Sequence, residues 1–206
     1  MASLRRNNAT RGTIDTSRPI GEGAFRVVYK GHYTKGEREG QPLVAKWFKT
    51  GVVFESRFYS EDIRAVDKAQ VWTFVESSER AGQKHLVEPY IEDFCKFNSN
   101  TGVVFDQHDA WSQAMQALSH YSYHASGGSY VLCDLQGGMT DEGMTLTDPV
   151  ILSRSGTRAY GATDLSLDGI STFFARHRCT KFCQSHWQQP RHQAIYFPAA
   201  RGTTFM

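Results

Sequence analysis

The chain has 206 residues, of which 40% are hydrophobic and 21% are charged, a balance typical of a globular rather than a disordered protein. A formal net charge of +2 is too weak to indicate the clustered basic surface of a nucleic-acid-binding protein, and no window approaches the ~18 consecutive apolar residues of a membrane helix. The first residues lack the apolar segment of a signal peptide, so we expect a cytoplasmic protein whose four cysteines are thiols or metal ligands.

The N-terminal half is predicted to begin with a disordered basic leader at 1–18, because its arginines lie in a polar segment without apolar periodicity. Strands are predicted where β-branched and aromatic residues cluster, at 26–30, 43–48 and 86–91. Residues 61–80 carry apolar side chains at roughly helical spacing and are predicted to form a helix. A turn-rich break at 98–102 predicts the boundary between an N-terminal lobe at about 19–97 and a C-terminal lobe at about 98–206.

The C-terminal half is predicted to contain two amphipathic helices, at about 109–123 and 166–177, and a short buried strand at 130–133. Residues 137–146, rich in Gly, Asp and Thr, are predicted to form a loop. The expected fold class is therefore α+β, with an antiparallel N-terminal sheet and one helix followed by a mixed C-terminal lobe.

A glycine loop and a lysine in a strand point to phosphate binding in the first half. Gly21 and Gly23 lie in the sequence Gly-Glu-Gly-Ala-Phe-Arg that ends at Arg26, and glycines let the backbone approach a phosphate closely. Lys46 lies in the apolar run Val-Ala-Lys-Trp-Phe, and a buried lysine needs an anionic partner. In conventional protein kinases such a lysine pairs with the α- and β-phosphates of ATP. The alternatives are structural glycines in a hairpin and a solvated strand lysine.

The other motifs of a conventional kinase are missing, since His-Arg-Asp, Asp-Phe-Gly and Ala-Pro-Glu occur nowhere in the sequence. Two carboxylates have a suitable context: Asp134 ends the strand predicted at 130–133, and Asp148 precedes Pro149. Each alone is typical of a turn or cap. Together with Gln136 they form an oxygen-ligand set suited to magnesium.

A cluster at the end of the last predicted helix has the residue types of a zinc site. His177, Cys179 and Cys183 supply three ligands, one fewer than a closed tetrahedral site requires. The residues alone leave the fourth ligand open among Cys95, Cys133, His120, His124 and His186. The alternative is three unrelated soft residues near a helix end.

Taken in order, these motifs resemble those of the alpha-kinases, a family of atypical Ser/Thr protein kinases. The resemblance runs from about Pro19 to His186. Its motifs are Gly-Ala-Phe-Arg at 23–26, Val-Ala-Lys at 44–46, Val-Glu-Pro-Tyr-Ile at 87–91, Asn-Ser-Asn-Thr-Gly at 98–102, Ser-His-Tyr at 119–121, Asp-Leu-Gln-Gly at 134–137, Leu-Thr-Asp-Pro at 146–149, Gly-Ala-Thr-Asp-Leu at 161–165 and His-x-Cys-x-x-x-Cys at 177–183.

The resemblance implies a two-lobed, atypical protein-kinase-like fold with an ATP cleft between the lobes and a zinc-stapled C-terminal lobe. Arg26 and Lys46, with the glycine loop at 21–23, would contact the phosphates of ATP. Glu88 and the backbone near Tyr90 would contact the adenine.

For the second half, the resemblance implies that Asp134 is the acceptor of the substrate proton or its electrostatic partner, and that Gln136 and Asp148 hold Mg²⁺. Since the family divides the catalytic role between its two aspartates, both stay candidates. The match for the missing zinc ligand is His120, in the Ser-His-Tyr segment. The residues of the peptide-substrate loop would be Gly161, Thr163, Asp164 and Gly169.

The implied function is transfer of the γ-phosphoryl group of ATP to Ser and Thr hydroxyls of a protein substrate. One alternative is an inactive or weakly active regulatory module that binds protein partners. Such a module would have lost the lysine or an aspartate, whereas Lys46, Asp134 and Asp148 are all present. A zinc hydrolase is another alternative, but it leaves the glycine loop and Lys46 unexplained.

Overall fold

The computed structural model describes residues 7–23, 25–49, 70–75, 79–140, 143–200 and 204–205. The chain divides into two compact units: unit 1 comprises residues 1–92 and 202–206, and unit 2 comprises residues 93–201. The division thus falls at 92/93, a few residues before the 97/98 boundary expected from the sequence. None of the helices in the described part of the chain has the length and apolarity needed to cross a bilayer.

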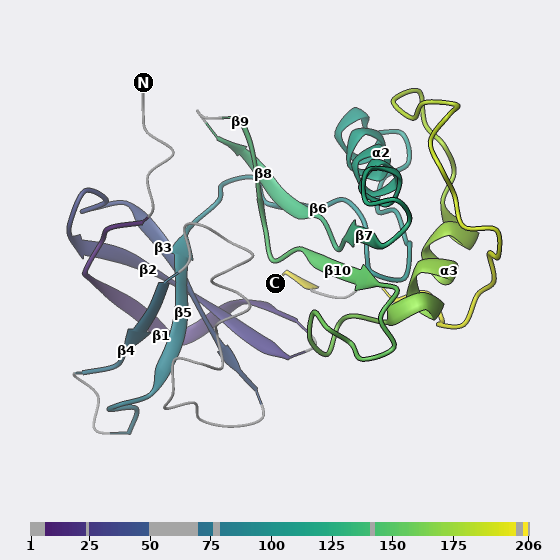
Figure 1. Ribbon diagram of the computed structural model, residues 1–206. Helices are drawn as coiled ribbons and strands as arrows, with labels where there is room; N and C mark the ends of the chain where they lie inside the picture. Colours follow the sequence, from purple (N-terminus) through teal and green to yellow (C-terminus); the bar gives the residue numbers. More distant parts are fainter. Residues whose placement is uncertain are drawn as a thin grey trace. The chain divides into compact units, whose positions relative to one another are not determined.

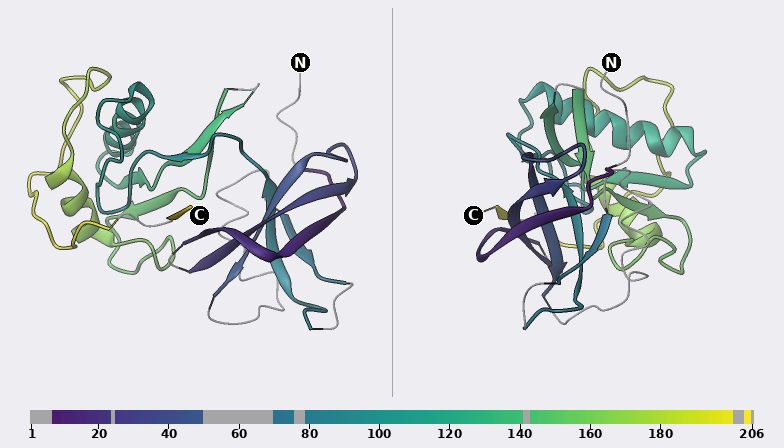
Figure 2. Two further views of the ribbon diagram at one scale, coloured as in Figure 1. Left: turned by 180° about the vertical axis from the view of Figure 1, so that it is seen from behind. Right: turned by 90° about the vertical axis from the view of Figure 1, so that its left-hand side faces the viewer.

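Unit 1 is a twisted, six-stranded antiparallel sheet with the strand order β11-β1-β2-β3-β5-β4 (Figures 1 and 2). Its strands are β1 (Arg11–Glu22), β2 (Arg26–Lys35), β3 (Pro42–Phe48), β4 (Gln70–Thr73), β5 (Lys84–Pro89) and β11 (Thr204–Phe205). Its core lies on one face of the sheet, where the buried residues are Ala9, Tyr33, Leu43, Ala45 and Val87. Side chains of the opposite face, including Lys46, alternate with these along the strands.

The predicted disordered leader at 1–18 is wrong for residues 7–18. Strand β1 begins at Arg11, and the side-chain amide of Asn7 donates a hydrogen bond to the Tyr33 hydroxyl at 2.8 Å. Most side chains of residues 11–18 are exposed, so the segment shows no apolar pattern. Its backbone still pairs with β2, because ladder hydrogen bonds do not depend on side-chain polarity. Residues 1–6 lie outside the described part.

The predicted helix at 61–80 is wrong where the structure describes it. Residues 70–73 form β4, which pairs with β5, and residues 61–69 lie outside the described part. Val71, Trp72 and Thr73 are β-branched or aromatic, and Trp72 packs edge-on against Tyr33 with ring centroids 5.8 Å apart. Pairing with β5 and packing against Tyr33 therefore decide the structure of this segment, although its apolar residues lie at roughly helical spacing.

In its described residues, unit 2 combines two helices with small antiparallel sheets (Figure 1). Its elements are β6 (Cys95–Lys96), α2 (Ala110–Ala125), β7 (Tyr130–Cys133), β8 (Gln136–Thr140), β9 (Gly143–Thr147), β10 (Val150–Ser153) and α3 (Ser166–Arg176). Both predicted helices and the strand at 130–133 are confirmed, with helix ends that differ by at most two residues. Strand β7 pairs with β10, and β8 lies between β6 and β9.

The loop predicted at 137–146 is instead the hairpin β8–β9. Gly137 explains why the segment is rich in glycine: a Cβ at this position would lie 1.9 Å from the Thr145 carbonyl oxygen of the facing strand. Only glycine allows this close approach. The glycine content that predicts a flexible loop is therefore explained, at Gly137, by two strands that pair closely.

Helix α3 packs against the β7–β10 pair and forms the main core of unit 2. The buried residues of this core are Tyr123, Val131, Cys133, Val150, Leu152, Ile170, Phe173 and Phe174. This packing fixes the end of β7, where Asp134 follows, and the end of α3, where His177 follows. Both candidate sites of unit 2 are thus attached to its core.

Candidate functional site

The predicted phosphate-binding residues of unit 1 lie on one face of its sheet. Lys46 pairs in register with Val28, which is two residues from Arg26, so the two cationic side chains point to the same side. The Arg26 guanidinium lies over the Phe48 ring, 5.0 Å from its centroid. The loop between β1 and β2 is tight, because the Gly23 amide donates to the Arg26 carbonyl at 2.8 Å.

Lys46 is buried and forms an ion pair across the sheet. Its Nζ lies 3.0 Å from Oε2 of Glu88, which is also buried. Sequence reasoning predicted that Lys46 needs an anionic partner but did not find this one, because β3 and β5 are far apart in the sequence. The predicted contact of Glu88 with adenine stays a prediction. The Tyr90 amide already donates to the Pro42 carbonyl at 3.1 Å, so any adenine donor must come from the neighbouring backbone.

Asp134 follows β7 in a left-handed backbone conformation, with φ at 57°. This conformation is uncommon outside glycine and is found at functional sites. The Asp134 carboxylate forms an ion pair with Lys96 of β6, at 2.8 Å between Nζ and Oδ1. Burial raises the pKa of Asp134, while the charge of Lys96 lowers it and that of Asp148 raises it further. Lys96 was not predicted, since nothing in its local sequence marks it.

Hairpin β8–β9 brings together the predicted magnesium ligands. Gln136 pairs with Thr147, and Asp148 is the next residue after Thr147. Gln136 is buried, and among the residues that the structure describes its Oε1 has no hydrogen-bond partner. Asp148 also adopts a left-handed conformation, with φ at 47°. A buried amide oxygen without a partner beside a carboxylate fits a hard cation.

Asn98 is a buried residue that holds the segment carrying this site, and sequence reasoning assigned it no role. Its side-chain amide donates to Gln116 Oε1 at 2.8 Å and to Ser119 Oγ at 3.0 Å, both on α2. Its Oδ1 accepts the amide of Leu135 at 3.0 Å. Asn98 therefore ties the backbone between Asp134 and Gln136 to helix α2. The motif Asn-Ser-Asn-Thr-Gly was the available signal.

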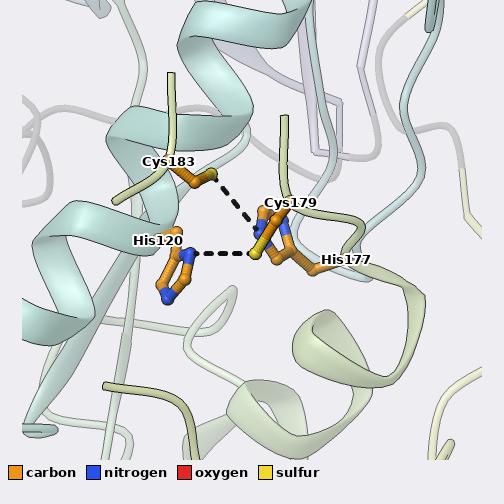
Figure 3. Close-up of side chains that lie close together, drawn as sticks. All are labelled: His120, His177, Cys179 and Cys183. Atoms are coloured by element: carbon orange, nitrogen blue, oxygen red, sulfur yellow. Dashed lines mark hydrogen bonds between the residues drawn. The ribbon is translucent and has the colours of Figure 1, made fainter. Parts of the chain in front are cut away.

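The four predicted zinc ligands converge (Figure 3). His120 comes from α2, and the other three follow α3 in the segment 177–183. One donor atom from each residue lies within 4.8 Å of all the others. Sγ of Cys179 is 3.8 Å from Nδ1 of His120, and Sγ of Cys183 is 4.0 Å from Nε2 of His177. Donor atoms around a tetrahedral zinc would be separated by about 3.3–3.8 Å.

The histidines of this cluster are held in the neutral form that binds metals. Burial lowers the pKa of His177 to about 4 and also lowers the pKa of His120. Burial also raises the pKa of the Cys179 thiol, with the neighbouring Cys183 adding to the shift. A dication at this position would favour the thiolate form of Cys179 and offset both effects.

The predicted substrate loop is only partly a loop. Gly169 lies inside α3 and is buried, where a Cβ would lie 2.5 Å from that of Leu165. Asp164 is fully buried and accepts hydrogen bonds from the amide and hydroxyl of Ser153, at 2.9 and 2.7 Å. Both residues are therefore buried in the packing around the loop and are not available to contact a substrate. Gly161 and Thr163 do lie in the loop, with Gly161 at φ 91°.

Comparison with known proteins identifies the family. The profile of the alpha-kinase family matches residues 21–75 and 69–183 of this chain. The chain belongs to the alpha-kinase family. The prediction from the sequence motifs is thus confirmed.

Two curated alpha-kinases illustrate the similarity. The chain is 30% identical over 196 residues to eukaryotic elongation factor 2 kinase of Rattus norvegicus, covering 82% of this chain and 26% of that protein. It is 37% identical over 99 residues to alpha-protein kinase vwkA of Dictyostelium discoideum, covering 48% of this chain and 15% of that protein. The matched regions span about a quarter or less of these relatives.

Solved structures show the same fold. An alpha-kinase from Entamoeba histolytica matches with a TM-score of 0.68 and 19% identity, over 95% of this chain and 85% of that chain. The alpha-kinase domain of myosin-II heavy chain kinase A in complex with AMP-PNP matches with a TM-score of 0.66 and 21% identity, over 84% and 86%. The α+β kinase fold expected from the sequence is therefore confirmed.

Proposed function

We propose that this alpha-kinase chain is an ATP-dependent protein kinase that transfers the γ-phosphoryl group to Ser and Thr hydroxyls of a protein substrate. The observation that carries the proposal is the arrangement around Asp134: a carboxylate with a raised pKa beside Gln136, and Asp148 at the end of the same hairpin. Family membership supports the same function.

Unit 1 would bind the triphosphate. The Lys46 ammonium and the Arg26 guanidinium lie on the same face of the sheet and would offset the charge of the phosphates. The ion pair with Glu88 fixes the position of Lys46 before the nucleotide arrives. Such preorganisation avoids the cost of orienting a flexible side chain during the reaction.

Unit 2 would orient the acceptor and hold the cation. Gln136 and Asp148 would bind Mg²⁺, which supplies charge neutralisation on the phosphates when bound. The substrate hydroxyl oxygen attacks the γ-phosphorus, the bond to the ADP oxygen breaks, and the hydroxyl proton passes to the Asp134 carboxylate. Burial raises the pKa of this carboxylate and makes it a stronger base. Lys96 keeps it ionised and in place.

We further propose that His120, His177, Cys179 and Cys183 hold a structural zinc ion. Four protein ligands leave no open position for a water nucleophile, so the ion would stabilise unit 2 rather than take part in chemistry. Metal analysis of the purified chain should find one zinc per chain. Cys183→Ala should lose the ion and unfold unit 2, because binding and folding are coupled. A folded, active preparation without zinc would contradict this role.

Incubation with labelled ATP and a generic basic protein, with and without Mg²⁺, tests the kinase activity. We expect magnesium-dependent labelling of Ser and Thr in the parent chain and at least about 100-fold slower labelling in Asp134→Asn. Binding of ATP without any transfer would instead support the regulatory module. Zinc-dependent hydrolysis without nucleotide binding would support the hydrolase.

A further inference from the structure

The segment after Cys183 covers the His/Cys cluster. The family match ends at residue 183, and the segment 184–200, drawn in yellow, continues beside α2 and α3 (Figures 1 and 2). The Trp187 ring lies edge-on to the His120 ring, with centroids 5.4 Å apart. Residues 187–193 thus belong to the surroundings of the cluster although no recognised motif includes them.

The first polar contact of this segment selects the ligating nitrogen of His120. Nε2 of His120 lies 3.0 Å from the Gln188 carbonyl oxygen. Since a carbonyl only accepts hydrogen bonds, Nε2 carries the proton of the neutral ring. Nδ1 then has a free lone pair, and it is this atom that lies 3.8 Å from Sγ of Cys179. A partner on the second nitrogen is the usual way in which a protein orients a metal-binding histidine.

The second contact is a hydrogen bond to a ligand sulfur. Nε2 of Gln189 lies 3.4 Å from Sγ of Cys179. The orientation of the Gln189 amide is fixed by Gln193, whose Nε2 donates to the Gln189 Oε1 at 3.1 Å. The Cys183 sulfur receives its donor from inside the motif, the Thr180 amide at 3.4 Å. Each ligand sulfur thus accepts a hydrogen bond from an N–H group, and the donor to Cys179 comes from the C-terminal segment.

The segment is held in place by contacts that do not involve the cluster. The Ala194 amide donates to Ser171 Oγ at 2.8 Å, and the Tyr196 amide donates to Thr172 Oγ1 at 2.9 Å. Ser171 and Thr172 are buried on α3. Gln189 is therefore positioned before a metal binds, rather than recruited by it.

We propose that Gln188 and Gln189 are outer-shell positioning residues of the metal centre, and that the Gln189 amide stabilises the Cys179 thiolate as a zinc ligand. This inference rests on the zinc site proposed above. Cys179 is exposed, whereas both histidines are buried. An N–H donor withdraws charge from the thiolate and lowers its reactivity. Loss of an outer-shell partner typically weakens metal binding about 10–100-fold.

Gln189→Met tests this proposal in the full chain, because methionine keeps the length of the side chain but removes the donor. We expect zinc to transfer to a chromogenic chelator about 10–100-fold faster than from the parent. Gln107→Met, at another exposed glutamine of unit 2, should release zinc at the parental rate. The far-UV circular dichroism spectrum of the zinc-loaded variant, before chelator is added, should match that of the parent, since Gln189 is exposed.

A spectroscopic readout separates an electronic role from simple packing. In the Co²⁺-substituted chain, loss of the N–H donor should move the thiolate-to-cobalt charge-transfer band to lower energy in Gln189→Met and leave it unchanged in Gln107→Met. Equal release rates and an unshifted band in Gln189→Met would overturn the proposal. Absence of zinc from the parent chain would instead refute the zinc site itself, so the two failures are distinguishable.

Discussion

The two units each contain a buried lysine paired with a carboxylate, and the two pairs differ in what they leave accessible. In unit 1, Lys46 and Glu88 lie 3.0 Å apart, and their side chains are 7% and 4% exposed. In unit 2, Lys96 and Asp134 lie 2.8 Å apart, and their side chains are 4% and 18% exposed. The first pair is buried at both ends, whereas the second exposes part of its carboxylate.

This difference follows from the backbone. Glu88 lies in the regular strand β5, while Asp134 lies after the end of β7 at φ 57°. A carboxylate within a strand is fixed by its neighbours on both sides, but one that follows a strand can point out of the sheet while its backbone stays anchored. In unit 1 the carboxylate therefore supports the lysine. In unit 2 the lysine supports the carboxylate, which is the group expected to react.

The largest effect is expected at the accessible carboxylate. Asp134→Asn should lower kcat by about 10²–10⁴-fold while ATP binding is retained, because the amide cannot accept the hydroxyl proton. Asp148→Asn should instead raise the Mg²⁺ concentration needed for half-maximal rate, because it removes a charged ligand. Titration of Mg²⁺ against both variants measures the difference. If both show the magnesium dependence of the parent, the proposed division of roles between the aspartates is wrong.

The second effect is expected at Lys46. Lys46→Met alone would leave the Glu88 carboxylate buried without its lysine, which destabilises a protein by about 3–5 kcal/mol. The double variant Lys46→Met/Glu88→Gln removes both charges and should stay folded. We expect kcat/KM for ATP to fall about 10²–10³-fold, the usual cost of losing a charge-stabilising group.

Lys35→Met, at the exposed end of β2, is the matched control for this experiment and should keep the parental rate. Near-normal turnover in the folded double variant would show that Lys46 only braces the sheet.

A smaller effect is expected at Lys96. Burial already raises the pKa of Asp134, and the charge of Lys96 opposes that shift. Lys96→Met should therefore raise the pKa further, so that the acidic limb of the kcat–pH profile moves upward by about one pH unit or more. Exposed Lys181→Met should leave the profile unchanged. An unmoved acidic limb in Lys96→Met would show that Asp134 is not the group that titrates in catalysis.

The same comparison explains how much of the site could be predicted from the sequence. Local motifs mark Lys46, Asp134 and the cluster at 177–183, because their residue types and spacing are typical of phosphate, magnesium and zinc binding. Lys96 and the partnership of Lys46 with Glu88 depend on strands that meet only in the folded chain, so no local pattern marks them. Family resemblance supplied His120, which the residues alone left as one candidate among several.

The fold shows the same limit. Helix α3 and strand β7 were predictable because their periodicity reflects one buried face. Strand β1 was missed because most side chains of residues 11–18 are exposed, and β4 because its apolar residues also suited a loose helical pattern. The sequence predicts a loop in place of hairpin β8–β9 because the glycine that permits its close pairing is also typical of loops. In each case the missing information was the partner strand.

The smallest effect at neutral pH is expected at His85, a buried residue of β5 that is kept neutral by its surroundings. His85 is 2% exposed, and its ring packs against that of Phe74, with ring centroids 4.5 Å apart. Burial lowers its pKa from 6.5 to about 4. The unfolded chain therefore binds more protons than the folded one between these values, so stability falls as pH decreases through this window and returns as pH rises.

The parent should lose about 2 kcal/mol of unfolding free energy between pH 7 and pH 5 that His85→Phe does not lose. Urea unfolding at both pH values measures this, with His32→Phe at an exposed position as the control. Identical pH dependence in His85→Phe and the parent would mean that the pKa of His85 does not change on folding, and that burial in unit 1 does not keep the ring neutral.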